Sequence, residues 1–161
     1  TDVAFRFGEL NDSSLHAKLV CKSRLYIVAS PDYLALKGTP TQPEELEQHD
    51  LIGFTRPTYI NSWPIKVGDE YFFAQSKIKA SSGETVRQLT IRGHGIARLS
   101  EFEIWKDMEE GRLIALFEDK IEHQYQSIHA VYYQQEHLPK RIRLFIEFLA
   151  EQLKDGFKNA L

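Results

Sequence analysis

The sequence contains a single cysteine, Cys21, among its 161 residues. One cysteine cannot form an internal disulfide or a cysteine-rich zinc site, which favours a reducing compartment and hence a cytoplasmic location. Long apolar runs are also absent, because no segment reaches the uninterrupted length that a membrane-spanning helix needs. The chain opens on Thr1 and Asp2 rather than on the charged and apolar regions of a signal peptide. We therefore expect no secretion and no membrane partner.

An excess of positive charge is missing as well. Twenty lysines and arginines stand against 23 aspartates and glutamates, which leaves a formal net charge of -3 at pH 7. A protein that binds nucleic acid directly uses basic side chains to neutralise the phosphate backbone. We therefore expect this segment by itself not to bind DNA or RNA.

Glycine and proline occur in ordinary numbers, nine and six, beside 42% hydrophobic and 27% charged residues. This composition argues against collagen-like, low-complexity and disordered chains. The length suits one domain or two small lobes and is sufficient to bury a core. Because the chain lacks an initiator methionine and starts with the pattern of an interior strand, we expect it to begin inside a larger protein.

Alternating and short apolar runs predict a series of strands. We expect them at 3–7, 15–20, 24–29, 50–54, 78–80, 96–99, 113–117 and 128–133, with a hairpin of 63–67 and 70–73 around Gly68 and Asp69. Pro64 has no N–H for a ladder hydrogen bond, so its strand should be an edge strand. Strands that alternate with helices favour an α/β fold with a mainly parallel sheet.

Capping residues and apolar faces predict the helices. Ser30 and Pro31 open a helix over 31–37, and Thr41 with Glu44 matches a capping box before 44–48. Ser81 and Glu84 match a second capping box, which starts a helix that ends at Gly93. A short helix is expected over 104–110. The last helix should run from Pro139 to Gly156, with one apolar face formed by Ile142, Phe145, Ile146, Leu149 and Leu153.

No motif in the sequence indicates an enzyme. Gly93-His94-Gly95 lacks the third glycine of a dinucleotide loop, and no Gly-Lys-Ser/Thr phosphate loop occurs. The six histidines show neither helical i, i+4 spacing nor a cysteine partner, so we expect no metal and no cofactor. The acidic residues clustered around the short helix indicate a solvated face; they are Glu101, Glu103, Asp107, Glu109 and Glu110.

The junction from Ala80 to Gly83 is the candidate binding feature. Ligands of open α/β sheets lie at the carboxyl ends of strands, where helix N-termini present N–H groups. A small anion could accept hydrogen bonds there, with Arg6 as a supporting cation on another strand. The competing interpretation is that Ser81 and Glu84 only cap each other, which would place the Glu84 carboxylate in the same positive field.

Several segments resemble one family in order and spacing: 2–10, 12–15, 29–34, 38–40, 43–46, 49–51, 93–97, 111–113, 128–133, 139–143 and 145–149. They are similar to the effector-binding domain of LysR-type transcriptional regulators, which are bacterial, and the closing strand and helix resemble the CrgA-like subgroup. The resemblance covers nearly the whole chain.

The resemblance implies a two-lobed α/β fold of the periplasmic-binding-protein type 2 class, with an effector in the cleft between the lobes. Residues 1–24 would be a partial first lobe and crossover, 25–121 a complete second lobe, and 122–161 the return strand and C-terminal helix of the first lobe. The expected effector-binding residues are Phe5, Arg6 and Phe7 in the first lobe, and Ser81, Ser82, Gly83 and Ser100 in the second.

The resemblance also implies a set of partners. These are a small-molecule effector, anionic or aromatic in character, a second copy of the chain in a dimer or tetramer, and DNA through a separate N-terminal winged helix-turn-helix domain. A solute-binding receptor with no role in transcription is the alternative on the same fold.

Overall fold

The computed structural model describes residues 3–8, 10, 15–122, 125–133 and 139–153. The chain forms two compact units: unit 1 comprises Thr1–Ser23 and Tyr125–Leu161, and unit 2 comprises Arg24–Gln124. The expected lobe limits at residues 24 and 121 stay a prediction. One strand, β2 (Leu15–Ala29), has its first part in unit 1 and its last part in unit 2.

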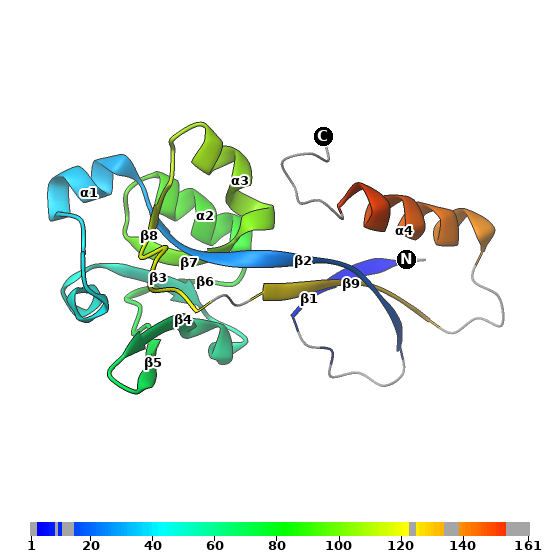
Figure 1. Ribbon diagram of the computed structural model, residues 1–161, viewed down its shortest axis with the longest axis horizontal. Helices are drawn as coiled ribbons and strands as arrows, with labels where there is room; N and C mark the ends of the chain where they lie inside the picture. Colours follow the sequence, from blue (N-terminus) through cyan, green and yellow to red (C-terminus); the bar gives the residue numbers. More distant parts are fainter. Residues whose placement is uncertain (1–2, 9, 11–14, 123–124, 134–138, 154–161) are drawn as a thin grey trace. The chain divides into compact units, whose positions relative to one another are not determined.

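Unit 1 is built on antiparallel strands and one helix (Figure 1). Strand β9 (Tyr125–Tyr133) lies between β1 (Ala4–Phe7) and β2, and pairs with β1 in antiparallel register. Helix α4 (Lys140–Gln152) follows Pro139, which is its N-cap residue rather than its first helical residue. An ion pair between Lys18 of β2 and Glu147 of α4, 3.7 Å from Nζ to Oε1, joins helix and sheet.

The apolar face expected for the last helix is only partly buried. Ile142 and Ile146 are buried, but Phe145 is 48% exposed. Leu144 and Phe148, on the same helix, are 50% and 59% exposed. The expected end of the helix at Gly156 lies outside the described residues. Within unit 1, α4 therefore carries apolar side chains that its own sheet does not cover.

Unit 2 contains a mixed sheet. Strand β3 (Leu51–Phe54) pairs in parallel with β6 (Ile78–Ala80) and β7 (Ile96–Ser100). Strand β2 pairs antiparallel with both β7 and β8 (Ile114–Leu116). The expectation of a mainly parallel sheet is therefore wrong, because β2 runs against its neighbours. Parallel pairing of consecutive strands occurs where α2 (Gly83–Ile91) provides the crossover from β6 to β7.

Each face of this sheet covers a separate core. On one face, Trp63 and Ile65 of β4 (Ser62–Val67) and Phe72 of β5 (Glu70–Phe73) pack with Ile27 and Ile96. Strands β4 and β5 form the predicted two-stranded hairpin, so Pro64 lies in an edge strand as expected. That core also receives residues of α1 (Pro31–Lys37) and of the 3-10 helix η1 (Pro43–Gln48).

On the other face, α2 and α3 (Glu101–Glu109) cover the sheet (Figure 1). Val86 of α2 and Ile104 of α3 pack with Val28, Ile52 and Leu99 of three neighbouring strands. This arrangement fixes both helices on the sheet, with their N-termini immediately after the ends of β6 and β7.

Local capping was predicted correctly in one place and wrongly in another. Ser30 caps α1 by accepting the Tyr33 N–H at 3.2 Å, and α1 ends at Gly38, as expected. Thr41 does not pair with Glu44: its backbone N–H and hydroxyl both donate to Glu45. The 3-10 geometry of η1, which tightens the turn, accompanies this different pairing.

The limits of one strand and of one helix also differ from expectation. The separate strands predicted at 15–20 and 24–29 are one continuous strand, because no glycine or proline interrupts the chain between them. The short helix predicted from Ile104 begins three residues earlier, directly after Ser100. Another 3-10 helix, η2 (Thr58–Asn61), precedes β4.

Candidate functional site

Two helices begin at the carboxyl edge of the parallel strands in unit 2. Strand β6 ends at Ala80 and is followed by α2, whereas β7 ends at Ser100 and is followed by α3. Strands β6 and β7 flank β3, so the two helices start at the same end of the sheet. Helix N-termini present unpaired N–H groups and a partial positive charge at this edge.

The first turn of α2 is capped by Ser82, not by Ser81. The Ser82 hydroxyl accepts the Thr85 N–H at 3.2 Å and lies 2.9 Å from the Thr85 hydroxyl. The predicted capping box of Ser81 with Glu84 is therefore wrong. The Glu84 carboxylate instead accepts hydrogen bonds from Arg87 and Gln88 one turn along the helix, and these bonds lower the pKa of Glu84.

The first turn of α3 holds Ser100 and Glu103. Ser100 is only 3% exposed and forms the N-cap, while the Glu103 Oε2 accepts the Ser100 N–H at 3.3 Å. The role predicted for Ser100 as an effector contact remains a prediction. Ser100 and Glu103 form a reciprocal capping box, in which the Ser100 side chain accepts the Glu103 backbone N–H and the Glu103 carboxylate accepts the Ser100 N–H.

Glu103 also occupies the space beside Gly83. A Cβ placed on Gly83 would lie 1.7 Å from the Glu103 Oε1, which no side chain could tolerate without Glu103 moving. Glycine at this position thus allows the carboxylate of α3 to approach the backbone of α2. The sequence predicted that the Glu84 carboxylate would lie in the positive field at the N-terminus of α2, where an anionic ligand would also bind. In the structure the carboxylate beside this N-terminus belongs to Glu103.

Two charged side chains lie close to this edge without touching. Burial raises the pKa of Glu103, and burial lowers the pKa of Arg98 on β7 to about 10. Each charge partly offsets the shift of the other, yet no nitrogen of Arg98 lies within 4.0 Å of the Glu103 carboxylate oxygens in the described structure. Arg98 Nε is buried without a hydrogen-bond partner among the described residues.

Neither Arg98 nor Glu103 was predicted from the sequence as a residue of this site. Arg98 interrupts the apolar run from Ile96 to Leu99, and a cation inside a predicted buried strand is the signal that could have identified it. Glu103 was placed with the acidic residues of a solvated face. Its location beside Gly83, which is 20 positions earlier in the chain, could not be read from spacing within one helix.

Asp107 likewise differs from the solvated residue that was expected, because it is fully buried. Arg87 of α2 and Arg112 after α3 both donate to its carboxylate, with Nε to Oδ distances of 2.5 and 2.8 Å. Glu109 and Glu110 are exposed, in agreement with the prediction. The buried Asp107 therefore ties α2 to α3 and fixes the separation of their N-termini.

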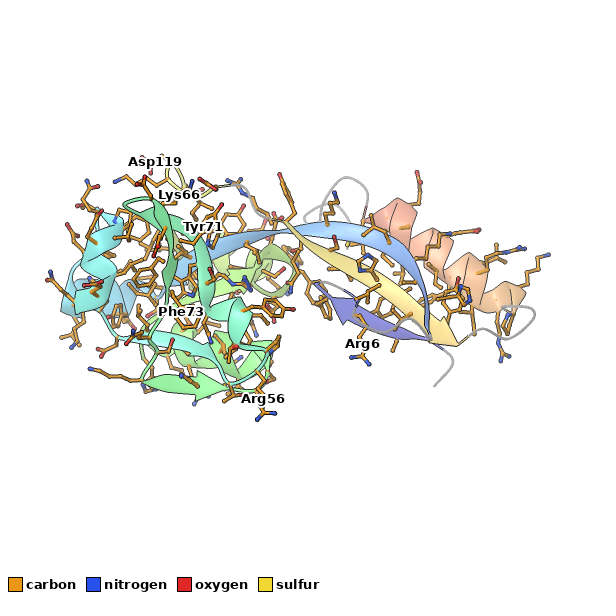
Figure 2. The ribbon with its side chains drawn as sticks, turned by 90° about the horizontal axis from the view of Figure 1, so that it is seen from below. Arg6, Arg56, Lys66, Tyr71, Phe73 and Asp119 are labelled. Carbon is orange, nitrogen blue, oxygen red and sulfur yellow. The ribbon has the colours of Figure 1, made fainter. Side chains whose placement is uncertain are left out.

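The predicted first-lobe residues belong to β1 in unit 1. In the pairing with β9, Phe5 and Phe7 lie opposite Ala130 and Ile128, whereas Arg6 lies opposite His129. Successive side chains of a strand point to opposite faces. Arg6 therefore faces away from Phe5 and Phe7, and Figure 2 shows its side chain projecting from the strand. A single ligand-facing wall cannot include all three side chains.

A cavity of about 470 Å³, not predicted from the sequence, lies in unit 2 at the amino ends of β3 and β6. Its lining includes His49, Asp50, Phe73, Gln75 and Lys77. The Tyr33 hydroxyl lies 3.0 Å from His49 Nδ1 and accepts the Asp50 N–H at 2.9 Å. This cavity is at the opposite end of β3 from the starts of α2 and α3, so it is separate from the predicted site.

No group of three or more histidine, cysteine, aspartate or glutamate side chains in the described part of the chain could hold a metal ion. Of the helices within the described ranges, none combines the length and apolarity that crossing a membrane requires.

Comparison with known proteins identifies the family. Residues 1–154 match the LysR substrate binding domain. This chain belongs to that family. It is 42% identical over 154 residues to the HTH-type transcriptional regulator CrgA of Neisseria meningitidis serogroup C, which covers 94% of the chain and 51% of CrgA. It is 32% identical over 162 residues to the HTH-type transcriptional regulator PtxR of Pseudomonas aeruginosa, which covers 99% of the chain and 52% of PtxR.

The structure of this chain agrees with the assignment to the LysR family. The CrgA regulatory domain from Neisseria meningitidis superimposes with a TM-score of 0.87 at 40% identity, covering 94% of the chain and 75% of the solved domain. The predicted resemblance and the two-lobed periplasmic-binding-protein type 2 fold class are therefore confirmed. The chain spans about half the length of the curated relatives it matches.

Proposed function

We propose that the chain is the effector-sensing and oligomerisation domain of a LysR-type transcriptional regulator, and that it binds a small-molecule co-inducer between two lobes. The observation that carries the proposal is the family match over residues 1–154, together with the two helix N-termini at the carboxyl edge of unit 2. Ligands of open α/β sheets bind at such edges. The proposed regulator acts in the cytoplasm and is not an enzyme.

DNA binding is assigned to a winged helix-turn-helix domain outside this chain. The relatives CrgA and PtxR are both HTH-type transcriptional regulators, and the chain matches about half of each. The net charge of -3 supports this division, because the segment has no basic excess with which to hold a phosphate backbone. The alternative of a solute-binding receptor is not favoured, since these relatives are regulators.

Oligomerisation is proposed to involve a second copy of the chain and the exposed face of α4. Leu144, Phe145 and Phe148 leave about half of each side chain in contact with water. Exposed apolar patches of this kind mark interaction surfaces more often than isolated exposed residues do. Sedimentation of the chain at increasing concentration should show self-association, and replacing Phe145 and Phe148 by serine should shift the population to monomer. A monomer at every concentration would contradict this part of the proposal.

The effector-sensing role is tested at the start of α2 in the intact regulator. Ser82→Trp should abolish the transcriptional response, because the indole covers the first N–H groups of the helix. Ser82→Ala is the matched control: it removes the same cap, at a cost of about 1 kcal/mol, without adding bulk. An unchanged response in Ser82→Trp, with folding intact by circular dichroism, would exclude this edge as the effector site.

A further inference from the structure

The cavity at the amino ends of β3 and β6 is formed by residues of unit 2 alone. Its volume of about 470 Å³ lies within the range of small-molecule sites in proteins, roughly 300–1,000 Å³. Three separate segments form its walls: the chain from the end of η1 to the start of β3, the end of β5, and the chain just before β6. The cavity is therefore large enough for a small ligand, and its lining decides which chemistry fits.

The segment 49–51 is a preformed wall of this cavity. The Asp50 N–H donates to the hydroxyl of the buried Tyr33 at 2.9 Å, and the Asp50 carbonyl accepts the Ile96 N–H at 2.9 Å. A Cβ on Gly95 would lie 2.4 Å from that carbonyl oxygen, so glycine is needed for this close approach. These contacts hold the wall in place before a ligand binds, as in most small-molecule sites.

His49 offers the cavity a hydrogen-bond donor. The Tyr33 hydroxyl accepts the Asp50 N–H, so its single proton is left for His49 Nδ1, which is 3.0 Å away. A neutral imidazole that accepts at Nδ1 carries its own proton on Nε2. Burial lowers the pKa of His49, which favours this neutral form. Because the described residues provide no partner for Nε2, its N–H can donate to a carbonyl oxygen of a ligand.

Asp50 offers an acceptor beside this donor. Its carboxylate lies 3.5 Å from Lys37 Nζ and 3.8 Å from Lys77 Nζ, and Lys77 lines the same cavity. All three side chains are more than one-third exposed, and such ion pairs are weak. The carboxylate thus keeps acceptor capacity for an N–H of a ligand. Since the lysines offset its charge, an uncharged donor suits this position better than an ammonium or a second carboxylate.

Phe73 supplies an aromatic surface to the same cavity (Figure 2). Its side chain is 52% exposed at the end of β5, whereas Phe72 and Leu51, which also line the cavity, are buried. A flat ring packs favourably against an aromatic side chain in an offset or edge-to-face arrangement. The lining therefore combines an apolar aromatic wall with one donor and one acceptor on neighbouring residues.

We propose that this cavity is a second ligand site, which binds a small, neutral, planar ring with a lactam edge, that is, an N–H group next to a carbonyl. The ring packs on Phe73, its N–H donates to the Asp50 carboxylate, and its carbonyl oxygen accepts the His49 Nε2–H. Pyridones and pyrimidine bases have this chemistry. The inference goes beyond the proposed function, because the cavity lies at the opposite end of β3 from the starts of α2 and α3.

The test is a titration of the 161-residue chain followed by NMR of its backbone amides. The lactam probes are uracil and 2-pyridone. Their matched comparisons are 1,3-dimethyluracil and N-methyl-2-pyridone, which keep the ring and the carbonyl but lose the N–H; benzoate and benzylamine are the charged comparisons. At least one lactam should shift the amide signals of Asp50, Leu51 and Phe73. It should bind about tenfold or more tightly than its methylated form, as expected when a hydrogen bond to a charged group is lost.

Variants assign the three contacts. Asp50→Ala, His49→Phe and Phe73→Leu should each weaken binding of the lactam, and Asp50→Ala should also abolish its advantage over the methylated form. Asp119→Ala and Phe102→Leu are the matched controls, because both side chains are exposed and lie outside the cavity lining, and they should leave the affinity unchanged. If His49→Phe does not fold, the other two variants, at more exposed side chains, provide the comparison.

Other results overturn the proposal. Equal affinities of a lactam and its methylated form would show that no ligand N–H reaches Asp50, and tighter binding of benzoate or benzylamine would make this a site for a charged group. Signals confined to Gly83 and Ser100 would assign the probe to the opposite edge. Binding of neither lactam also refutes the inference. The proposed function fails separately, in the Ser82→Trp experiment on the intact regulator, which does not depend on this cavity.

Discussion

Arg87 of α2 forms a two-point ion pair with Asp107 of α3, with Nε to Oδ2 and Nη2 to Oδ1 distances of 2.5 and 2.8 Å. Arg87 also holds Glu84 through Nη1, at 3.0 Å from Oε1. The Asp107 side chain is fully buried, and Arg87 and Arg112 are the two ion-pair partners of its carboxylate. The pair fixes α2 against α3 and thereby sets the positions of Gly83 and Glu103.

Replacing Asp107 should therefore destabilise unit 2 strongly. Asp107→Ala leaves the largely buried guanidinium of Arg87 without its main partner, which should lower the free energy of unfolding by about 3–5 kcal/mol. Urea unfolding followed by tryptophan fluorescence measures the loss, since Trp63 is buried in the same unit. Glu109→Ala, an exposed change on the same helix, should stay within about 0.5 kcal/mol. Equal effects of the two substitutions would show that the ion pair contributes little.

The Tyr33 hydroxyl should contribute measurably to the free energy of unfolding. It accepts the Asp50 N–H at 2.9 Å and is 3.0 Å from His49 Nδ1, so Tyr33→Phe leaves a backbone donor without its partner. We expect a loss of about 1–3 kcal/mol in urea unfolding. Tyr59→Phe, which alters an exposed tyrosine of the same unit, serves as the control. A loss no larger than that of the control would contradict the expectation.

Glu103 should make stability depend on pH. Burial raises the pKa of Glu103, so the folded protein binds this proton more tightly than the unfolded chain does. The stability that this tighter proton binding contributes is fully present below the pKa of Glu103 in the unfolded chain. It is lost as the pH rises through the pKa of Glu103 in the folded protein. Glu103→Gln keeps an oxygen for the Ser100 N–H and removes the titration.

The stability of Glu103→Gln relative to the original protein should therefore increase from about pH 4 to pH 8. Chemical unfolding at several pH values measures the difference. The exposed Glu109→Gln should show no such trend. A difference that decreases as the pH rises has the wrong sign for a buried carboxylate and would contradict the assignment.

Cys21 should react slowly with thiol reagents. Burial raises the pKa of the Cys21 thiol, which reduces the fraction of reactive thiolate, and the side chain is only 9% exposed. Modification by a disulfide reagent at about pH 8 should be tenfold or more slower in the folded chain than in urea. Similar rates in both states would mean that the cysteine is accessible in the native protein.

The chain alone should not retard operator DNA in a mobility-shift titration at low salt. Its net charge of -3 provides no general attraction to the phosphate backbone. The intact regulator, which includes the proposed N-terminal domain, is the positive control. Sequence-specific binding by these 161 residues would contradict the division of roles.

Several features could be predicted from sequence because they depend on neighbouring residues. Ser30 and Pro31 start α1 and Gly38 ends it, and the Gly68-Asp69 turn joins β4 to β5, since caps and tight turns are formed within about four residues. The alternation that separates Arg6 from Phe5 and Phe7 is equally local, because a strand has a period of two residues. The order and spacing of short segments along the chain also indicated the right family.

Other features were decided only by tertiary structure. Asp107 and Glu103 were expected in water, yet one is fully buried against Arg87 and the other lies beside Gly83. Their positions within α3 do not distinguish Asp107 and Glu103 from the exposed acidic residues of the same segment. Whether a charge is solvated or buried depends on which distant elements pack over it, and here these are α2 and β7. The sequence by itself determined the elements and the family, whereas packing of α2 against α3 decided which charges form the candidate site.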